Sequence, residues 1–281
     1  MVGVVILNYN NSNLTLDCLE SLYRCCPDAR FKVCVVDNAS SPEALSLLEK
    51  GLTRGEALVK SPVNCGYARG NNLGCEWFEN DPEVDKILIL NDDCLFCEDI
   101  LSPLSAYLDA YPDCGVVFPL VKGPEGNVDA ACLRRAKSNA DLFLQAGFLG
   151  RFTSLRGEFI DADGVEGLDC AIHTGVPPGS CMMLPKEYFR SIGYLDPNTF
   201  LYFEEHILAA KLNRDGRSCV LLPAYKIIHL GAQTTKKQSS KSIYRHWRNS
   251  YLYFLKAWSS MPLPLRLWLR FRTALTLALK R

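Results

Sequence analysis

Residues 86–93 constrain the fold most, because four apolar residues, Ile87 to Leu90, lead directly into two adjacent acids, Asp92 and Asp93. A short unbroken apolar run is typical of a strand buried on both faces, as in a mostly parallel sheet. The two acids would then lie past the carboxyl end of this strand, at the edge where open α/β sheets bind their ligands. Adjacent carboxylates repel each other, so they indicate either a hard divalent cation or a solvated turn. Both interpretations are open at this point.

Strand-like and helix-like patterns alternate along the chain, which predicts βαβ units around a parallel sheet. With 281 residues, 48% of them hydrophobic, the chain can bury the core of one large α/β domain. Residues 120–172 are rich in glycine, show no clear period, and could hold a region specific for an acceptor. The predicted strands are residues 2–7, 31–36, 57–60, 87–90, 116–119, 181–184, 219–222 and 226–231, and the predicted helices begin near residues 12, 42, 66, 99, 186 and 204.

Polar loops follow the first two predicted strands, at residues 8–11 and 37–41. A third polar segment, residues 64–74, brings three glycines, three asparagines and Arg69 to the start of a predicted helix. A glycine-rich helix start can accept phosphate at its free N–H groups, and a plain helix cap is the alternative. Because the spacing is not Gly-x-Gly-x-x-Gly and no P-loop lysine is present, neither a dinucleotide fingerprint nor a P-loop is predicted.

Two further groups carry possible chemistry. Glu204 and Glu205 open a predicted helix, where acids are also favoured for the purely structural reason that they complement the helix dipole. Paired carboxylates can be held in different ionisation states, as acid–base catalysis requires. His229 follows two isoleucines at the end of the last predicted strand, where a histidine is either a satisfied core residue or a ligand.

Charge is divided unevenly, although the formal net charge is zero. Residues 1–206 carry 16 Lys/Arg and 30 Asp/Glu, whereas residues 207–281 carry 15 Lys/Arg and one acid. Within residues 241–281, aromatic and apolar side chains recur at helical spacing between cations. This pattern predicts amphipathic helices that contact an anionic membrane surface, with packing against the protein's own core as the alternative.

No run of about 20 uninterrupted apolar residues is present, so no membrane-spanning helix is expected. The chain starts directly with a strand-like segment and has an odd number of cysteines, 13, so neither a secretory signal nor a disulfide framework is expected. We therefore expect a cytoplasmic protein that is peripheral at the inner face of the cell membrane, with no nucleic-acid partner.

Seven short motifs together resemble the inverting family 2 glycosyltransferases of the GT-A fold. The similarity is greatest to the rhamnosyltransferase-like branch that builds bacterial surface polysaccharides, and it covers residues 2–235. The motifs, in chain order, are Val4-Val5-Ile6-Leu7-Asn8-Tyr9-Asn10, Val35-Val36-Asp37-Asn38-Ala39-Ser40, Asn64-x-Gly66-Tyr67-Ala68-x-Gly70-x-Asn72-x-Gly74, Leu90-Asn91-Asp92-Asp93, Gly179-Ser180-Cys181-Met182-Met183-Leu184, Leu201-Tyr202-Phe203-Glu204-Glu205 and Ile228-His229-Leu230-Gly231.

The resemblance implies a Rossmann-like, mostly parallel central sheet flanked by helices in residues 1–235. A nucleotide-sugar half would span about 1–118 and an acceptor half about 119–235, and a basic, aromatic, amphipathic helical extension would follow at 236–281. It also implies transfer of a sugar, with inversion, from a nucleotide-sugar donor to a glycan or lipid-linked acceptor in surface polysaccharide synthesis. The expected donor is dTDP-rhamnose or a UDP-hexose, and the expected cofactor is Mg²⁺ or Mn²⁺.

The resemblance also assigns roles to single residues. Asp93 and His229 match the metal site, and Glu205, with Glu204 beside it, matches the general base. A base is needed because a sugar hydroxyl has a high pKa, and a divalent ion can stabilise the leaving diphosphate. The residues predicted to contact the nucleotide sugar are Asn8, Asn10, Asp37, Asn91 and Asp92 from the resemblance, with Asn64 and Arg69 from the glycine-rich helix start.

The sequence departs from the family pattern just after the acidic pair. The family often has a further acid one residue beyond the pair, whereas here His206 fills the intervening position and Ile207 replaces the acid. The departures concern the identity of the base more than the reaction class. Two alternatives are open: a sugar-phosphate nucleotidyltransferase, which would release pyrophosphate, and a non-catalytic sugar-nucleotide-binding subunit, which Ile207 would suggest.

Overall fold

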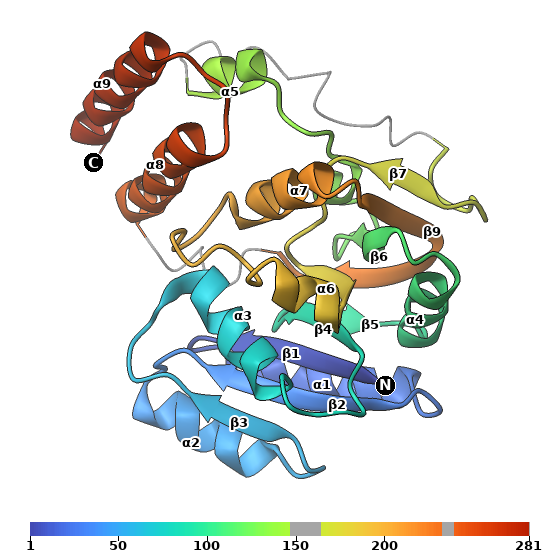
Figure 1. The fold of residues 1–281 in the computed structure, drawn as a ribbon. Helices are drawn as coiled ribbons and strands as arrows, with labels where there is room; N and C mark the ends of the chain where they lie inside the picture. Colours follow the sequence, from blue (N-terminus) through green and yellow to red (C-terminus); the bar gives the residue numbers. More distant parts are fainter. Residues whose placement is uncertain (147–163, 232–238, 281) are drawn as a thin grey trace.

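The computed structural model describes residues 1–146, 164–231 and 239–280. The strands of these residues form one sheet in the order β3-β2-β1-β4-β8-β6-β9-β5 (Figure 1). Strand β7 is not part of this order and pairs with β9. Helices flank the sheet, which confirms the predicted α/β fold class. The elements are β1 (Val2–Asn8), α1 (Ser12–Cys25), β2 (Phe31–Asp37), α2 (Pro42–Gly51), β3 (Ala57–Lys60), α3 (Gly66–Trp77), β4 (Lys86–Asn91), β5 (Cys94–Phe96), α4 (Leu101–Ala110), β6 (Cys114–Lys122), the 3₁₀ turn η1 (Ala130–Leu133), α5 (Asn139–Gln145), β7 (Ile172–Thr174), β8 (Cys181–Pro185), α6 (Lys186–Ser191), α7 (Glu204–Arg214), β9 (Ser218–His229), α8 (Ser240–Ala257) and α9 (Leu263–Leu279).

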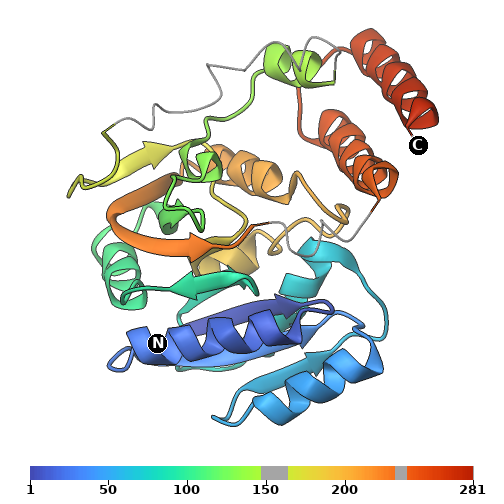
Figure 2. The same ribbon diagram turned by 180° about the vertical axis from the view of Figure 1, so that it is seen from behind.

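The amino-terminal half is a parallel sheet, as its alternating pattern predicts. β1 pairs in parallel with both β2 and β4, and β2 pairs in parallel with β3. Helices α1 and α2 cover one face (Figure 2), while α3 covers the other (Figure 1). The α3 backbone approaches the sheet closely at Gly74, where an added Cβ would lie 2.4 Å from a methyl carbon of Val5. Because the strands run in one direction, Asn8, Asp37 and Asn91 end at the same edge in neighbouring registers.

The second half of the sheet is mixed. β8 returns antiparallel to β4 and β6, and β6 runs parallel to β9. The short strand β5, just after Asp92 and Asp93, is antiparallel to the end of β9 with Cys94 opposite His229. This register brings the acids after β4 beside a histidine that follows them by more than 130 residues. The site edge is therefore built from both halves of the sheet.

The structure corrects the sequence interpretation at β9, which is one strand of 12 residues rather than two separate strands. Leu222 pairs with Pro119, and the next pair is Lys226 with Leu120, so three residues from Pro223 bulge out of register. Proline has no N–H group to donate a hydrogen bond to a neighbouring strand. In the sequence, Pro223 therefore looks like the end of a strand. The predicted division between the two halves, near residues 118 and 119, falls inside β6, so the halves share a strand.

In the segment predicted to be irregular, residues 120–172, the described part includes two short ordered elements between β6 and β7. Asp129 caps the turn η1, and Ser138 opens α5 with a capping box in which Asp141 is the partner. Three glycines of this segment, at positions 147, 150 and 157, lie outside the described residues, as does the predicted boundary near residue 235.

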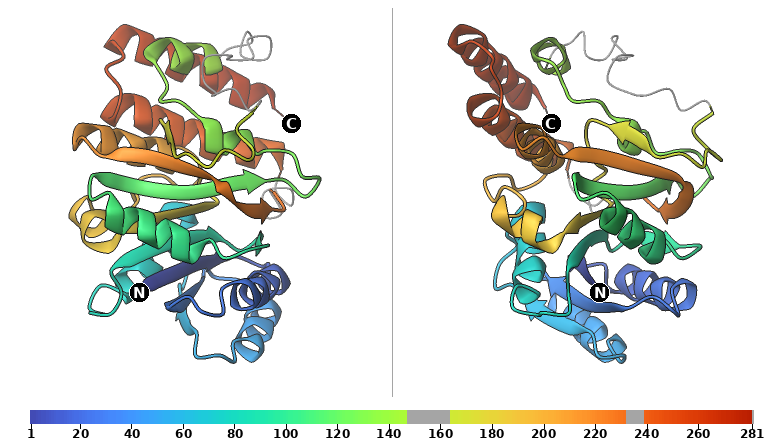
Figure 3. Two further views of the ribbon diagram at one scale, coloured as in Figure 1. Left: turned by 90° about the vertical axis from the view of Figure 1, so that its right-hand side faces the viewer. Right: turned by 45° about the vertical axis from the view of Figure 1, so that its right-hand side comes forward.

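The carboxyl-terminal region forms two helices that differ in environment. Ile207 of α7, Tyr251 and Phe254 of α8, and Leu269 of α9 share a second apolar cluster, separate from the core around the sheet. Figure 3 shows α8 between α7 and α9, with α9 as the outermost helix. For α8, the structure therefore shows the alternative interpretation, in which the helix packs against apolar residues of the protein itself. Among the described helices, none is long and apolar enough to cross a membrane.

Candidate active site

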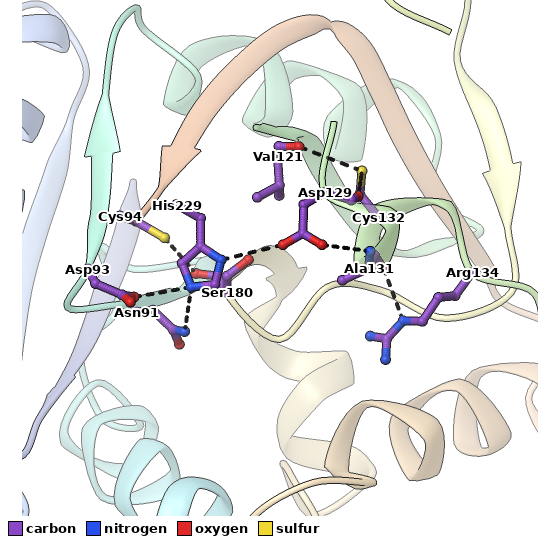
Figure 4. Close-up of polar contacts among 10 residues, drawn as sticks. All are labelled: Asn91, Asp93, Cys94, Val121, Asp129, Ala131, Cys132, Arg134, Ser180 and His229. Carbon is purple, nitrogen blue, oxygen red and sulfur yellow. Dashed lines mark hydrogen bonds and ion pairs between the residues drawn. The ribbon is translucent and has the colours of Figure 1, made fainter. Parts of the chain in front are cut away.

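Asp93 and His229 lie side by side at the edge of the sheet. Oδ1 of Asp93 is 3.2 Å from Nε2 of His229, and the amide nitrogen of Asn91 is 3.5 Å from the same ring nitrogen (Figure 4). Asp93 is buried, yet its Oδ1 accepts no well-oriented hydrogen bond within the described residues. Burying a carboxylate oxygen in this way is costly, which is the situation that a cation relieves.

The donor set at this corner fits a divalent metal. Ligand atoms of Asp93, Cys94 and His229 all lie within 4.8 Å of one another. A carboxylate oxygen with an imidazole nitrogen suits Mn²⁺, whereas Mg²⁺ prefers oxygen alone. The thiol of Cys94 is buried and donates a hydrogen bond to the carbonyl of Ser180, so Asp93 and His229 are the two residues placed to hold an ion.

Asp129 supports His229 from the other side. Its Oδ2 lies 3.5 Å from Nδ1 of His229, on the opposite side of the ring from Asp93 (Figure 4). Burial alone would lower the pKa of His229, but the neighbouring carboxylates of Asp129 and Asp93 raise it to about 9. A carboxylate behind a histidine commonly fixes the tautomer and the orientation of the ring towards a metal. Asp129 was not among the predicted site residues.

The residues predicted to contact the nucleotide form a network among themselves. Asn8 is fully buried and donates hydrogen bonds to Asp37 at 2.9 Å and to Ser40 at 3.1 Å. Asn10 ties the same two loops together, because its side chain accepts a hydrogen bond from the Ser41 amide. Asn8 thus lies behind Asp37 as its support, and the carboxylate of Asp37, at the end of β2, also accepts from the Ser40 amide.

The glycine-rich start of α3 is braced against the loop before α7. Gly66 has a φ of +84°, and a Cβ there would lie 2.4 Å from the carbonyl oxygen of Phe200, so only glycine fits. The side chain of Asn64 accepts a hydrogen bond from the Gly66 amide, which stabilises the turn that leads into α3. Arg69 is exposed and donates to the carbonyl of Pro197 at 2.8 Å, so its contact in this structure is with the protein.

The acidic pair begins α7 after a strained approach. Tyr202 and Phe203 both have a φ of +70°, a left-handed conformation that is costly for side chains of this size and is concentrated at functional sites. Glu205 forms an ion pair with Arg134 at 2.8 Å, and both side chains are 13% exposed. Burial and the neighbouring charge of Glu205 raise the pKa of Glu204 well above its ordinary value. Burial acts on Glu205 too, but Arg134 lowers the pKa of Glu205 to about 2.

Tyr67, on α3, links the acidic pair to the metal corner. Burial raises the pKa of its hydroxyl, and the neighbouring carboxyl groups of Glu204 and Glu205 add to the effect. The hydroxyl donates to the carbonyl of Gly179, next to the Ser180 carbonyl that accepts from Cys94. Tyr67 therefore lies between the acidic pair and the loop that contacts Cys94, the residue after Asp93.

Residues 3–192, which include β1 to β8, match the family described as "Glycosyl transferase family 2". The match covers more than half of the chain. The chain belongs to this family. It is therefore an enzyme of the sugar-transferring class, which confirms the resemblance seen in the motifs and decides against the nucleotidyltransferase alternative.

Two characterised relatives are similar to this family 2 glycosyltransferase in sequence. The low-salt glycan biosynthesis hexosyltransferase Agl10 of Haloferax volcanii is 24% identical over 89% of this chain and 74% of that protein. The N-acetylglucosaminyl-diphospho-decaprenol L-rhamnosyltransferase of Mycobacterium tuberculosis is 25% identical over 71% of this chain and 62% of that protein. The chain thus spans just under two thirds of the mycobacterial relative.

The fold of this family 2 glycosyltransferase is also found among solved structures. GalNAc-T7, crystallised with UDP, GalNAc and Mn²⁺, superimposes with a TM-score of 0.63 and 15% sequence identity. The superposition covers 98% of this chain and 54% of GalNAc-T7. At this identity the likeness shows the fold, including the sheet and its flanking helices.

The departure at Ile207 has a packing explanation in this glycosyltransferase. Ile207 is fully buried in the apolar cluster with Tyr251 and Phe254 of α8, so its side chain faces the carboxyl-terminal helices. His206 is also buried and packs against Phe203 and Phe254, and burial lowers the pKa of His206 to about 3. An acid at position 207 would face apolar residues. Its replacement is therefore linked to the presence of α8.

Proposed function

We propose that this glycosyltransferase transfers a sugar from a nucleotide-sugar donor with inversion at the anomeric carbon, by a metal-dependent single displacement. The observation that carries the proposal is the divergent environment of the two acids at the start of α7. Arg134 holds Glu205 as a carboxylate, and that side chain keeps one buried oxygen, Oε2, without a hydrogen-bond partner among the described residues. A general base must be ionised and within reach of the hydroxyl that it deprotonates.

Each predicted residue has a role in this proposal. Glu205 accepts the proton of the acceptor hydroxyl as its oxygen attacks, with Glu204 beside it as a protonated neighbour. Asp93 and His229 would hold Mg²⁺ or Mn²⁺, and a bound ion would supply positive charge to the departing nucleoside diphosphate. The nucleotide and sugar lie over the loops that end β1, β2 and β4, which carry Asn8, Asn10, Asp37, Asn91 and Asp92, and beside Asn64 and Arg69 at the start of α3.

We propose dTDP-rhamnose or a UDP-hexose as the donor, and a lipid-linked or growing glycan of a surface polysaccharide as the acceptor. The rhamnosyltransferase and hexosyltransferase activities named for the two relatives support this choice. The presence of UDP and Mn²⁺ in the GalNAc-T7 crystal supports a nucleoside diphosphate bound with a metal.

A nucleotide-sugar panel tests the proposal. With dTDP-rhamnose, UDP-glucose, UDP-N-acetylglucosamine and GDP-mannose, the melting temperature should rise for one nucleotide class in the presence of Mn²⁺, and chelation should remove the shift, because ligand binding stabilises the folded state. Transfer should release a nucleoside diphosphate and give a product of inverted anomeric configuration by NMR. Release of pyrophosphate, or retention of configuration, would contradict the proposal.

We further propose that α9 binds the enzyme to the anionic cytoplasmic face of the cell membrane, where a lipid-linked acceptor would reside. Five large apolar side chains at four-residue spacing form a ridge along α9, and each is more than half exposed: Leu263, Leu267, Phe271, Leu275 and Leu279. Residues 216–281 contain no Asp or Glu, and Arg266, Arg270 and Arg272 lie between the ridge residues. A basic helix with an exposed apolar ridge is suited to the interface of an anionic bilayer.

Serine substitution of Phe271, Leu275 and Leu279 should weaken binding to phosphatidylglycerol-containing vesicles at least about tenfold, because each residue contributes roughly 1.5 kcal/mol or more when buried in an apolar phase. Co-sedimentation and soluble-acceptor activity measure the two effects, and activity should be unchanged. Serine at Leu47 and Trp77, which are exposed on α2 and α3, is the matched control. Undiminished binding of the ridge variant would refute membrane contact through α9. A variant lacking residues 241–281 is less suitable, because it would uncover Ile207 and Phe203.

A further inference from the structure

The turn η1 joins the two chemical halves of the site. Asp129, immediately before η1, contacts His229 and also accepts a hydrogen bond from the Ala131 amide at 2.9 Å. Arg134, immediately after η1, donates from Nε to the carbonyl of the same Ala131 at 3.0 Å. Figure 4 shows the resulting row from Asp93 through His229, Asp129 and Ala131 to Arg134. One short turn thus carries a support for the metal corner at one end and a contact to the acidic pair at the other.

The guanidinium of Arg134 is fixed by three partners. Besides the Ala131 carbonyl, Nη2 donates to the carbonyl of Pro177 at 2.8 Å, and Nη1 pairs with Oε1 of Glu205 at 2.8 Å. The backbone of Arg134 is held as well, because its carbonyl accepts hydrogen bonds from the amides of Gly175 and Val176. Gly175 permits this approach, since a Cβ there would lie 2.2 Å from the backbone nitrogen of Ala136. Both the side chain and the backbone of Arg134 are therefore held in place by hydrogen bonds.

We propose that Arg134 is a positioning residue for glycosyl transfer: it occupies Oε1 of Glu205 and so presents Oε2 as the oxygen that receives the proton of the acceptor hydroxyl. The inference rests on the proposed function, because it takes Glu205 as the base. Oε2 of Glu205 is buried and has no hydrogen-bond partner within the described residues, as is also the case for Oε2 of Glu204 beside it. Of the two acids, Glu205 is the one whose other oxygen is held by a cation. Arg134 does not touch substrate in this scheme and acts through Glu205 alone.

The chemical step balances with the groups present. The acceptor O–H bond breaks and its proton moves to Oε2 of Glu205, while the hydroxyl oxygen forms the new bond to the anomeric carbon. The bond from that carbon to the diphosphate breaks, and its electron pair leaves with the nucleoside diphosphate. Glu205 is then a neutral carboxylic acid beside Arg134, and it returns its proton to solvent before the next cycle.

Arg134 also determines which acid of the pair is charged. Burial and Glu205 raise the pKa of Glu204, whereas Arg134 lowers that of Glu205. The other titratable groups near Glu205 are His206 on the same helix, Tyr67 on α3 and Tyr202 before α7, and Lys137 lies near His206. The ion pair that Glu205 forms is with Arg134, which is not among these other groups. Removing it should raise the pKa of Glu205 and move the acidic limb of the rate profile to higher pH.

The test is the pH dependence of kcat for Arg134→Met and Arg134→Lys, with Arg135→Met as the control. Arg135 is the exposed neighbour in the chain. We expect Arg134→Met to lower kcat by about 10- to 100-fold at neutral pH and to move the acidic limb up by at least about one unit, with little change in the KM of the donor. Arg134→Lys should restore part of both, and Arg135→Met should leave both unchanged.

Two results would overturn the inference. In the first, the acidic limb of the pH profile of Arg134→Met stays where it is in the wild type. In the second, kcat falls equally in Arg134→Met and Arg134→Lys, and the acidic limb moves in neither. If Arg134→Met does not fold, as judged by its melting curve, Arg134→Lys is compared with the wild type instead. Lysine is a point cation without the forked contact to Glu205 and Pro177, so it should show a smaller loss of kcat and a smaller shift of the acidic limb in the same direction. The proposed function is tested separately by the wild-type protein. If the wild type transfers sugar and the Arg134 variants keep its pH profile, the positioning role alone is wrong.

Discussion

Glu205→Gln should lower kcat by about 10²- to 10⁴-fold while nucleotide affinity stays within about twofold, because the amide keeps the shape of the side chain and cannot accept the proton. Arg134 would still find an acceptor in the amide oxygen, so the start of α7 should remain in place. Initial rates over a range of acceptor concentrations measure the loss, and titration of the nucleoside diphosphate measures the binding.

The matched control for this prediction is Glu204→Gln. Glu204 precedes Glu205 in the chain, is buried, and has a raised pKa, so an amide there replaces the acid of the pair that holds its proton more tightly. Less than about tenfold of the rate should be lost. If Glu204→Gln is instead the more damaging variant, Glu204 is the base and Glu205 serves as its charged partner. A rate unaffected by both substitutions would show that neither acid of the pair is the base.

The fold could be predicted from the sequence where local patterns were strong. The unbroken apolar runs of β1, β2 and β4 have no stable place except a sheet covered on both faces, and the structure buries them there. β9 was predicted less well, because Pro223 looks like a strand end and the bulge that accommodates it depends on pairing with β6.

The candidate site divides in the same way. Asp92, Asp93 and the acidic pair were visible because two adjacent acids after an apolar run or before a helix are unusual in themselves. Asp129 and Arg134 were missed because they contact their partners, His229 and Glu205, across 100 and 71 residues of chain. Their segment has no periodic pattern, so neither hydrophobic spacing nor a short motif could show that contact.

The tail shows how one pattern can hide two environments. Aromatic and basic residues recur at helical spacing in both α8 and α9, so the sequence could not separate a membrane face from a packed face. In the structure, Tyr251 and Phe254 of α8 pack beside Ile207, whereas Phe271 of α9 is 71% exposed. Whether an amphipathic face is covered is decided by tertiary contacts, which the period of a helix does not contain.

Asp93→Ala should abolish most of the metal-dependent rate, with a loss of about 10²- to 10³-fold in kcat, the scale expected when charge stabilisation of a leaving group is removed. Asp93 is buried beside His229 at the end of β4, and no other carboxylate of the described residues joins that pair in the possible metal-binding group. His229, which must lose its proton before it can bind a metal, would then have to hold the ion alone, and a single imidazole binds a hard divalent cation poorly.

The loss should be visible without any turnover. Titration of Mn²⁺ followed by the EPR signal of the free ion should show about one strongly bound ion in the wild type with the nucleoside diphosphate, and weaker binding by at least about tenfold in Asp93→Ala. Asp28→Asn, at an exposed acid between α1 and β2, is the control for a general change in charge. Asp93 lies at the strand edge shared by both halves of the sheet, beside His229. If Asp93→Ala binds Mn²⁺ as tightly as the wild type, the ion is bound elsewhere. A metal ion would then no longer explain why an oxygen of Asp93 is buried without a hydrogen-bond partner.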